Sequence, residues 1–254
     1  MRRPMVVANW KMYTRPSDAY ILATTMRNMI APIEGVEVVV CPPLVFLSEI
    51  SDILKKDGKV NVGAQNMFYE PEGPYTGEVS PLMIRDMAKY VIVGHSERRA
   101  HFAETDTIVN EKVAAALKYG LVPIICVGEH TKNESIKFVV NQLEEALYDI
   151  PKKQYENLVI AYEPVWAIGT GTAATLDHAV KIITALREIV GLKTTMLYGG
   201  SVDESEAEKF SKHNQIDGLL VGTASLRASV FINIVKTWAE SRSFKGNVNL
   251  EEGK

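Results

Sequence analysis

The chain has 254 residues, of which 46% are hydrophobic and 23% charged, and its formal net charge is −3. This composition is typical of a globular protein, with enough apolar residues for one large domain or two small ones. The small negative charge excludes a strongly basic surface, so we expect no nucleic-acid partner and no attachment to a membrane.

Two features predict a reducing compartment. Cys41 and Cys126 each lie in an apolar run without C-x-x-C spacing, so both are expected to be reduced, buried and structural. The N-terminal sequence MRRPMVVANW has too few apolar residues for a signal peptide or a membrane span. We therefore predict a cytoplasmic protein.

Eight apolar, β-branched runs recur along the chain, each with the length of a buried strand. They are 5–8, 36–41, 60–64, 90–93, 121–127, 158–162, 194–198 and 216–221. Helical patterns lie between them; Ile136, Val139 and Leu143 share one face, for example. Gly120 and Gly191 follow two of these helices and supply helix-closing turns. Strict alternation of strands and helices predicts parallel pairing of the strands.

Eight such units fit either a closed (β/α)₈ barrel or an open, doubly wound sheet. An open dinucleotide-binding sheet would carry a glycine-rich turn after its first strand, whereas this chain carries Asn9-Trp10-Lys11 there. The sequence therefore favours an α/β fold with a single-domain (β/α)₈ barrel. No linker or charge block divides the chain, so the barrel is expected over residues 1–241, followed by a polar, poorly ordered tail over 242–254.

One connection is longer than a usual βα loop. Residues 66–79 read NMFYEPEGPYTGEV, and Met67, Phe68 and Tyr75 are large apolar side chains that need cover. The loop either folds against its own barrel or inserts into a second subunit; we favour insertion and predict a homodimer.

The stretch from Leu158 to Thr175 joins a buried strand to a carboxylate and then to an apolar loop. The strand ends at Glu163, Pro164 stops it, and Gly-Thr-Gly forms the tip of the loop. Because a solvated loop has no use for Trp166 and Ile168, we predict a lid that removes water from Glu163 and favours its action as a base. Thr175 can cap the next helix. The simpler interpretation is a buried loop in which Glu163 pairs with a cation.

Other polar residues also follow strands, where barrel proteins place their catalytic groups. His95 begins a helical turn after the fourth strand, and the helix dipole there disfavours a charged imidazole. Asn9 and Lys11 are expected on the same face of an extended segment, where an amide and an ammonium can meet one ligand oxygen. Glycine-rich turns at 199–201 and 222–223 follow the last two strands, where backbone N–H groups often bind phosphate. The other four histidines are interpreted as surface or packing residues, without metal-ligand spacing.

The motifs NWK at 9–11, GHSERR at 94–99, AYEPVWAIGTG at 161–171, YGGSV at 198–202 and VGTASL at 221–226 resemble, in this order, the triosephosphate isomerase family. The resemblance extends over the whole chain up to the polar tail. It implies the interconversion of dihydroxyacetone phosphate and D-glyceraldehyde 3-phosphate, in glycolysis and gluconeogenesis, without metal or organic cofactor. In the family, Glu163 moves the proton, a neutral His95 polarises the carbonyl, and Lys11 with Asn9 stabilises the enediolate.

The resemblance also assigns binding and supporting residues. The phosphate is expected on the N–H groups of Gly169, Ser201, Gly222 and Thr223. Tyr198 and Ser201 help to close the lid, Glu97 is expected to be a buried acid near Lys11, and Ser96 supports the site. The lid comprises Pro164, Val165, Trp166, Ala167, Ile168, Gly169, Thr170, Gly171, Thr172, Ala173 and Ala174. The dimer contacts are Thr76, Tyr75, Met67 and Phe68, with Thr76 reaching the partner's Asn9 and Lys11 region.

One departure and two alternatives bear on these expectations. The family commonly has a glycine where this chain has Thr223, and a β-branched residue is strained if the position needs a positive φ, so the phosphate grip is expected to shift. Another barrel isomerase for a larger sugar phosphate would share the phosphate turns but would not need so tight a lid. A barrel kept as an inactive binding scaffold would have lost some of Lys11, His95 and Glu163, and none is lost here.

Overall fold

The structure, a computed structural model, describes residues 2, 4–169 and 173–248, with side chains described as far as residue 241. Its centre is a closed barrel of parallel strands in the order β1 to β8, in which β8 pairs with β1. The strands are β1 (Met5–Asn9), β2 (Glu37–Cys41), β3 (Val60–Ala64), β4 (Tyr90–Val93), β5 (Val122–Val127), β6 (Val159–Tyr162), β7 (Thr195–Tyr198) and β8 (Gly218–Val221). The predicted (β/α)₈ barrel is confirmed.

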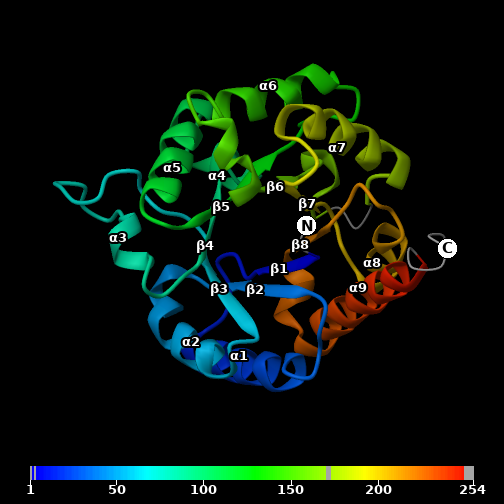
Figure 1. The fold of residues 1–254 in the computed structure, drawn as a ribbon. Helices are drawn as coiled ribbons and strands as arrows, with labels where there is room; N and C mark the ends of the chain where they lie inside the picture. Colours follow the sequence, from blue (N-terminus) through cyan, green and yellow to red (C-terminus); the bar gives the residue numbers. More distant parts are fainter. Residues whose placement is uncertain (1, 3, 170–172, 249–254) are drawn as a thin grey trace.

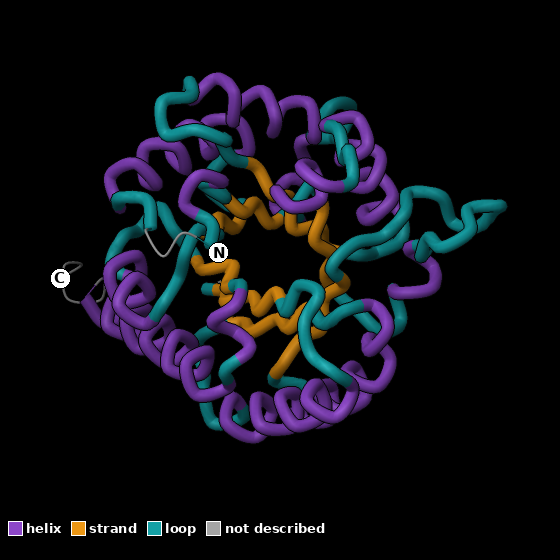
Figure 2. The backbone as a smooth tube through the Cα atoms, turned by 180° about the vertical axis from the view of Figure 1, so that it is seen from behind, coloured by secondary structure: helices purple, strands orange, loops and turns teal. Residues whose placement is uncertain are grey.

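The helices form a ring outside the barrel, and the strands lie inside it (Figures 1 and 2). They are α1 (Pro16–Ile30), α2 (Leu47–Leu54), α3 (Pro81–Ile84), α4 (Ser96–His101), α5 (Asp106–Lys118), α6 (Ile136–Ala146), α7 (Leu176–Val190), α8 (Glu204–Ser211) and α9 (Ala228–Val248). Thr175 caps α7 as expected, because its side chain accepts a hydrogen bond from the His178 N–H. Helix α9 continues past residue 241 to Val248, so the first residues of the expected tail are helical.

Alternate residues of every strand except β3 belong to two different apolar cores, as the two-residue period of a strand requires. Val6 and Ala8 pack outward against the helices in a large cluster that also includes helix residues such as Ile183. Met5 and Val7 pack with inward-facing residues of other strands in a smaller cluster inside the barrel. The barrel interior is therefore filled, and a ligand must bind at one of its ends.

The barrel closes where Gly218 of β8 pairs with Met5 of β1. A Cβ atom at Gly218 would collide with the carbonyl oxygen of Met5, so this seam requires glycine. We expect Gly218→Ala to lower the free energy of unfolding by about 1–3 kcal/mol, because the overpacked seam must shift. Urea unfolding measures this change; an unchanged midpoint would show that the seam has room for a methyl group.

The loop over residues 66–79 projects away from the barrel (Figures 1 and 2). Phe68 stacks on Tyr69 at a centroid distance of 4.2 Å and also contacts Tyr75, which is 42% exposed. Met67 differs from the expectation for a dimer contact, because it is fully buried in the core of its own chain. Met67 therefore fits the first interpretation, in which the loop folds against its own barrel, and the insertion of the loop into a second subunit stays a prediction.

Candidate active site

A cavity of about 310 Å³ opens at the carboxyl ends of β1, β7 and β8. Its walls bring together residues that are far apart in the sequence. They are Asn9, Lys11, Ile168, Gly169, Gly199, Gly200, Ser201, Val202, Leu220, Gly222, Thr223 and Ala224. All six residues that the sequence predicts for substrate binding line this cavity, and they come from strand exits and the predicted lid.

Glu163 and His95 lie next to each other at the exits of β6 and β4. Glu163 is 2% exposed; its Oε2 accepts a hydrogen bond of 3.0 Å from the Ser96 N–H. Its Oε1 lies 3.1 Å from His95 Nε2 and has no hydrogen-bond partner among the described residues. Glu163 also borders the cavity wall, because a Cβ atom on Gly199 would lie 3.0 Å from its Cγ. One carboxylate oxygen is thus held by a backbone N–H, and the other lies beside an imidazole nitrogen.

The start of α4 determines which ring nitrogen of His95 can donate a hydrogen bond. His95 is the N-cap residue, and its Nδ1 accepts a hydrogen bond of 3.2 Å from the Glu97 N–H. A ring nitrogen that accepts carries no proton, so the proton of a neutral ring is on Nε2, which faces Glu163. The geometry therefore leaves Nε2 as the donor nitrogen of the ring, on the side of Glu163.

Lys11 is not in the extended segment that the sequence suggested. Its φ is +52°, in the left-handed region, and its backbone N–H donates to Asn9 Oδ1 at 3.0 Å. This conformation is costly for a residue with a side chain, and such strain is common at functional sites. The turn directs the Lys11 ammonium to Glu97 Oε1 at 2.7 Å, at the edge of the cavity. Lys11 and Asn9 still converge, but through a turn and not through strand alternation.

Glu97 is near Lys11 as expected, but it is not buried, since 43% of its side chain is exposed. Burial alone would raise the pKa of Glu97; the hydrogen bond and positive charge of Lys11 outweigh this effect and lower it. Glu97 therefore remains charged and holds the ammonium in place.

Gln65 supports Lys11 and was missed in the sequence. Its side-chain amide donates to the carbonyl oxygens of Lys11 and Cys41, both at 2.9 Å. These two bonds tie the turn after β1 to the end of β2. The sequence does indicate this position, because Gln65 is the first polar residue after β3, just as Asn9 and His95 are polar residues at the ends of β1 and β4.

The two glycine-rich turns form one wall of the cavity. Thr223 is not among the described residues with positive φ, so the threonine is not strained there, and the expected cost does not arise. At Gly222 a Cβ atom would be a tight fit, because it would lie 3.2 Å from Lys11 Cε. The absence of a side chain lets the aliphatic part of Lys11 lie against the backbone of the turn at 222–223.

The predicted lid is described over 164–169 and 173–174; Thr170, Gly171 and Thr172 lie outside the described residues. Two hydrogen bonds hold its ends. The Trp166 indole donates to Glu129 Oε1 at 2.8 Å, and the Ala174 N–H donates to the Tyr198 hydroxyl at 3.0 Å. Burial raises the pKa of Tyr198 to about 12, so this hydroxyl keeps its proton at neutral pH.

Glu129, two residues after β5, was also missed. Its side chain is 1% exposed, and Oε1 is 2.8 Å from the Tyr162 hydroxyl and 2.9 Å from His178 Nε2, in addition to its bond from Trp166. His178 is therefore more than the surface or packing residue that the sequence suggested. The sequence around His178 has no motif that would indicate this contact, because its partner Glu129 is 49 residues away.

A buried network supports the loop that carries His95. Glu104 Oε1 accepts from the Gly94 N–H at 2.8 Å, and Glu104 Oε2 contacts Arg98 at 2.5 Å and Lys112 at 2.8 Å. Burial would raise the pKa of Glu104, but the neighbouring Lys112 and Arg98 lower it. Neither Glu104 nor Lys112 follows a strand directly, so reading strand exits could not identify them.

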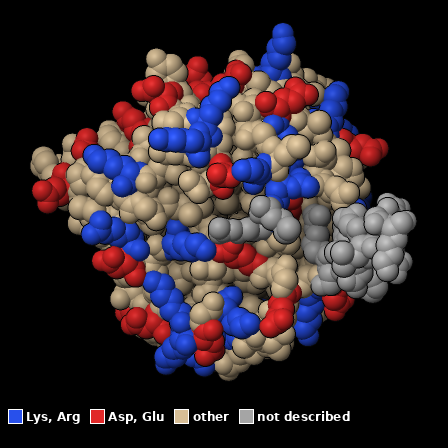
Figure 3. Space-filling view, in the orientation of Figure 1, with Lys and Arg blue, Asp and Glu red and all other residues tan. Residues whose placement is uncertain are grey.

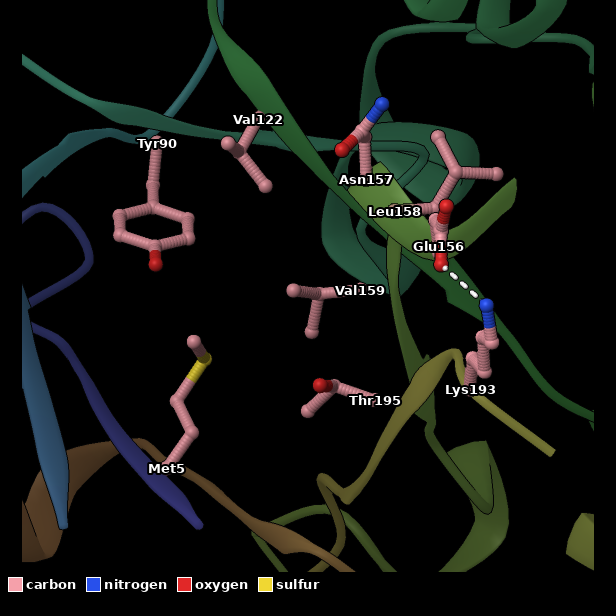
Figure 4. Close-up of a pocket in the computed structure, with 9 residues that line it drawn as sticks. All are labelled: Met5, Tyr90, Val122, Glu156, Asn157, Leu158, Val159, Lys193 and Thr195. Carbon is pink, nitrogen blue, oxygen red and sulfur yellow. Dashed lines mark ion pairs between the residues drawn. The ribbon is translucent and has the colours of Figure 1, made fainter. Parts of the chain in front are cut away.

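A second cavity, of about 240 Å³, lies at the opposite end of the barrel. Met5, Tyr90, Val122, Val159 and Thr195 line it, and each is the first residue of its strand (Figure 4). Its charged rim is an ion pair of 3.2 Å between Glu156 and Lys193. None of the predicted catalytic residues faces this cavity, so the first cavity is the candidate site.

The described surface agrees with the low net charge. In Figure 3, acidic and basic side chains are interspersed on the visible face, without a large area of one sign. Within the described part of the chain, no helix combines the length and the apolar character that a membrane span requires. Cys41 and Cys126 are both free and buried, and burial raises the pKa of each thiol.

Comparison with known proteins identifies the family. Its model, triosephosphate isomerase, matches residues 4–238. A triosephosphate isomerase of Dehalococcoides mccartyi (strain CBDB1) is 44% identical over 248 residues, which cover 93% of this chain and 96% of the relative. Those of Dictyoglomus thermophilum and Thermoanaerobacter pseudethanolicus are 42% and 44% identical and cover 93% and 92% of this chain. With the closed barrel and the residues gathered at its mouth, these matches show that the chain belongs to the triosephosphate isomerase family.

Proposed function

We propose that Glu163, His95, Lys11 and Asn9 carry out the isomerisation of triose phosphates in this chain. The substrates are dihydroxyacetone phosphate and D-glyceraldehyde 3-phosphate. One observation carries the assignment: the carboxylate of the buried Glu163 places Oε1 3.1 Å from His95 Nε2. A carboxylate that can accept a proton lies beside an imidazole, and it packs against Gly199 in the wall of a cavity that the glycine-rich turns line. This arrangement suits proton transfer next to a carbonyl.

The roles follow from the positions of these groups. Glu163 takes a proton from the carbon next to the carbonyl, and the electron pair moves to the carbonyl oxygen to form an enediolate. The His95 N–H and the Lys11 ammonium stabilise this oxygen, while the Asn9 amide orients the substrate. Glu163 then returns the proton to the neighbouring carbon, and His95 relays the hydroxyl proton between the two oxygens. The phosphate binds the N–H groups of Gly169, Ser201, Gly222 and Thr223, and no metal or organic cofactor takes part.

We expect Lys11→Met to lower kcat/KM by about 10- to 100-fold, the effect of losing one charged hydrogen bond to the substrate oxygens. Lys89→Met is the matched control, because Lys89 also pairs with a glutamate at 2.7 Å but precedes β4 at the other end of the barrel. A coupled assay with either triose phosphate measures both variants. If Lys11→Met is as active as Lys89→Met, the role of Lys11 is wrong.

The segment 164–174 acts as a lid in this proposal. The bonds at Trp166 and Ala174 support it, because they attach both described ends of the segment to residues around the site. A closed lid would exclude water and strengthen the electrostatic contacts of Glu163 and Lys11 with the reacting oxygens.

The active form is a homodimer in which the 66–79 loop enters the partner. Exposed Tyr75 and Thr76 at its end support this, together with apolar side chains on neighbouring loops: Met12 is 95% exposed, Val45 75% and Phe102 66%. Partner contact would also bring Thr76 to Asn9 and Lys11, as in the family.

For this assembly, sedimentation velocity at micromolar concentration should give a species of twice the chain mass of 28.2 kDa. Thr76→Arg, which adds a charge at the exposed end of the loop, should shift the protein towards monomers and lower its activity in parallel. A fully active monomer would contradict the proposal.

The remaining assignments are a single barrel domain over 1–241, a polar tail over 242–254 and a cytoplasmic location. The two free, buried cysteines support a reducing compartment. The interspersed surface charge offers no support for a nucleic-acid or membrane partner.

A further inference from the structure

Glu129 connects the two ends of the predicted lid. Trp166, near the start of the lid, donates to its Oε1, and His178, in the first turn of the helix that follows the lid, places Nε2 2.9 Å from the same oxygen. The His178 and Trp166 rings also pack edge to face, with centroids 5.8 Å apart. One buried oxygen therefore joins groups from both sides of the lid.

Glu129 depends on its hydrogen-bond donors, because it is buried and has no lysine or arginine partner among the described residues. Its side chain is 1% exposed, yet no described Lys or Arg lies within ion-pair distance, and its Oε2 has no described hydrogen-bond partner. Lys132, the nearest described cation along the chain, lies over the Trp166 ring instead, 5.8 Å from its centroid. A buried carboxylate without a fixed cation depends on its hydrogen-bond donors for its orientation.

The donors differ in how firmly they are held. His178 is fixed by its helix, because its backbone N–H bonds the capping Thr175 side chain and α7 is a regular helix over 15 residues. Tyr162 is fixed by the barrel, and burial together with the charge of Glu129 raises its pKa, so its hydroxyl remains a donor. Trp166 belongs to the segment that moves in a lid mechanism. Tyr162 and His178 thus fix the position of Glu129 Oε1, which also accepts the hydrogen bond from Trp166 in the lid.

We propose that His178 is a positioning residue for the lid: its Nε2–H orients Glu129 so that Oε1 receives the Trp166 indole when the lid covers the substrate. This inference rests on the lid role in the proposed function. His178 contacts neither the cavity nor Glu163, so it acts on the reaction only through Glu129 and Trp166. The role requires an N–H donor at the position of Nε2, and a glutamine amide can supply it.

The test compares three replacements of His178. His178→Leu removes the donor, His178→Asn keeps an amide that is too short to reach, and His178→Gln places an N–H group where Nε2 lies. We expect the first two to raise KM about fivefold to tenfold, the loss of roughly one hydrogen bond. The change in kcat should stay below about twofold, because a lid that loses one hydrogen bond still closes over bound substrate and still excludes water during the reaction. His178→Gln should restore a normal KM. His130→Leu is the control, since that exposed ring packs on Phe138 and not on Glu129.

A second measurement shows whether His178 acts through Trp166. With 5-fluorotryptophan in the protein, which has three tryptophans, the ¹⁹F resonance of Trp166 is assigned by its loss in Trp166→Phe. It should shift in His178→Leu and His178→Asn and return in His178→Gln. In a double-mutant cycle, His178→Leu should add nothing to the KM of Trp166→Phe. Additive effects, a normal KM in His178→Leu and His178→Asn, or an impaired His178→Gln would each overturn the inference.

The two levels of the proposal can fail separately. If Trp166→Phe leaves KM unchanged, the lid role itself is wrong, and this inference is wrong with it. If Trp166→Phe raises KM while His178→Leu and His178→Asn do not, only the role of His178 is wrong. If His178→Leu does not fold, His178→Asn and His178→Gln still decide between these outcomes.

Discussion

Glu163→Gln is expected to lower kcat by about 10²- to 10⁴-fold, because it removes the general base. The amide keeps the shape of the side chain, and its oxygen can still accept the hydrogen bond that the Ser96 N–H now gives to Glu163 Oε2. The other arm, beside His95 Nε2, would carry an NH₂ group that cannot take a proton. The loss therefore belongs to the transition state and not to substrate binding.

Binding and folding provide the controls for this variant. Titration with a phosphate-bearing substrate analogue should give a Kd close to that of the unchanged protein, because the phosphate turns and Lys11 are untouched. Glu163→Asp keeps a carboxylate but withdraws it by one methylene, so kcat should also fall by orders of magnitude. Near-normal turnover in either variant, with the fold intact, would rule out Glu163 as the base.

Glu104→Gln is expected to destabilise the protein by about 3–5 kcal/mol, since it leaves the buried Lys112 ammonium without its counter-charge. The side chains of this pair are 1% and 4% exposed and 2.8 Å apart. Glu104 also accepts from the Gly94 N–H, directly before His95. Urea unfolding at one fixed protein concentration measures the change, because the stability of a dimer depends on concentration.

Two further variants test whether the unpaired Lys112 charge causes the loss of stability in Glu104→Gln. Glu208→Gln breaks a pair of the same length, 2.8 Å, between exposed side chains and should not change the unfolding midpoint measurably. The double variant Glu104→Gln, Lys112→Met removes both charges and should recover much of the loss. If Glu104→Gln unfolds at the same urea concentration as the unchanged protein, the network does not stabilise the β4–α4 loop.

The contribution of Glu104 should also depend on pH. Its folded-state pKa is lowered, so the carboxylate stabilises the protein above its unfolded pKa of about 4.3 and the contribution is lost as the pH falls through the lower folded value. The stability difference between the protein and Glu104→Gln should therefore be complete at neutral pH and shrink below about pH 4. A difference that stays constant into this acid range would contradict the charge-based explanation.

The barrel was predictable because its signals are local. An apolar run such as that before Glu163 has to be buried, and alternation with amphipathic helices permits little other than parallel pairing. The start of a strand was less predictable: Val36 and Leu121 fit the apolar pattern but precede the first paired residues, Glu37 and Val122. Burial and strand pairing are different requirements, and only the first can be read from residue type.

The sequence by itself determined which strand exits carry Asn9, His95 and Glu163, since parallel strands of one barrel must end at one mouth. Only the tertiary structure decided how their neighbours are arranged. The left-handed turn at Lys11 depends on contacts from Asn9 and from Gln65, 54 residues away, and the exposure of Glu97 depends on what packs over it. The meeting of Glu129 with His178 depends on where two separate elements come to lie. Hydrogen bonds between distant side chains act over about 3 Å, so no pattern of neighbouring residues encodes them.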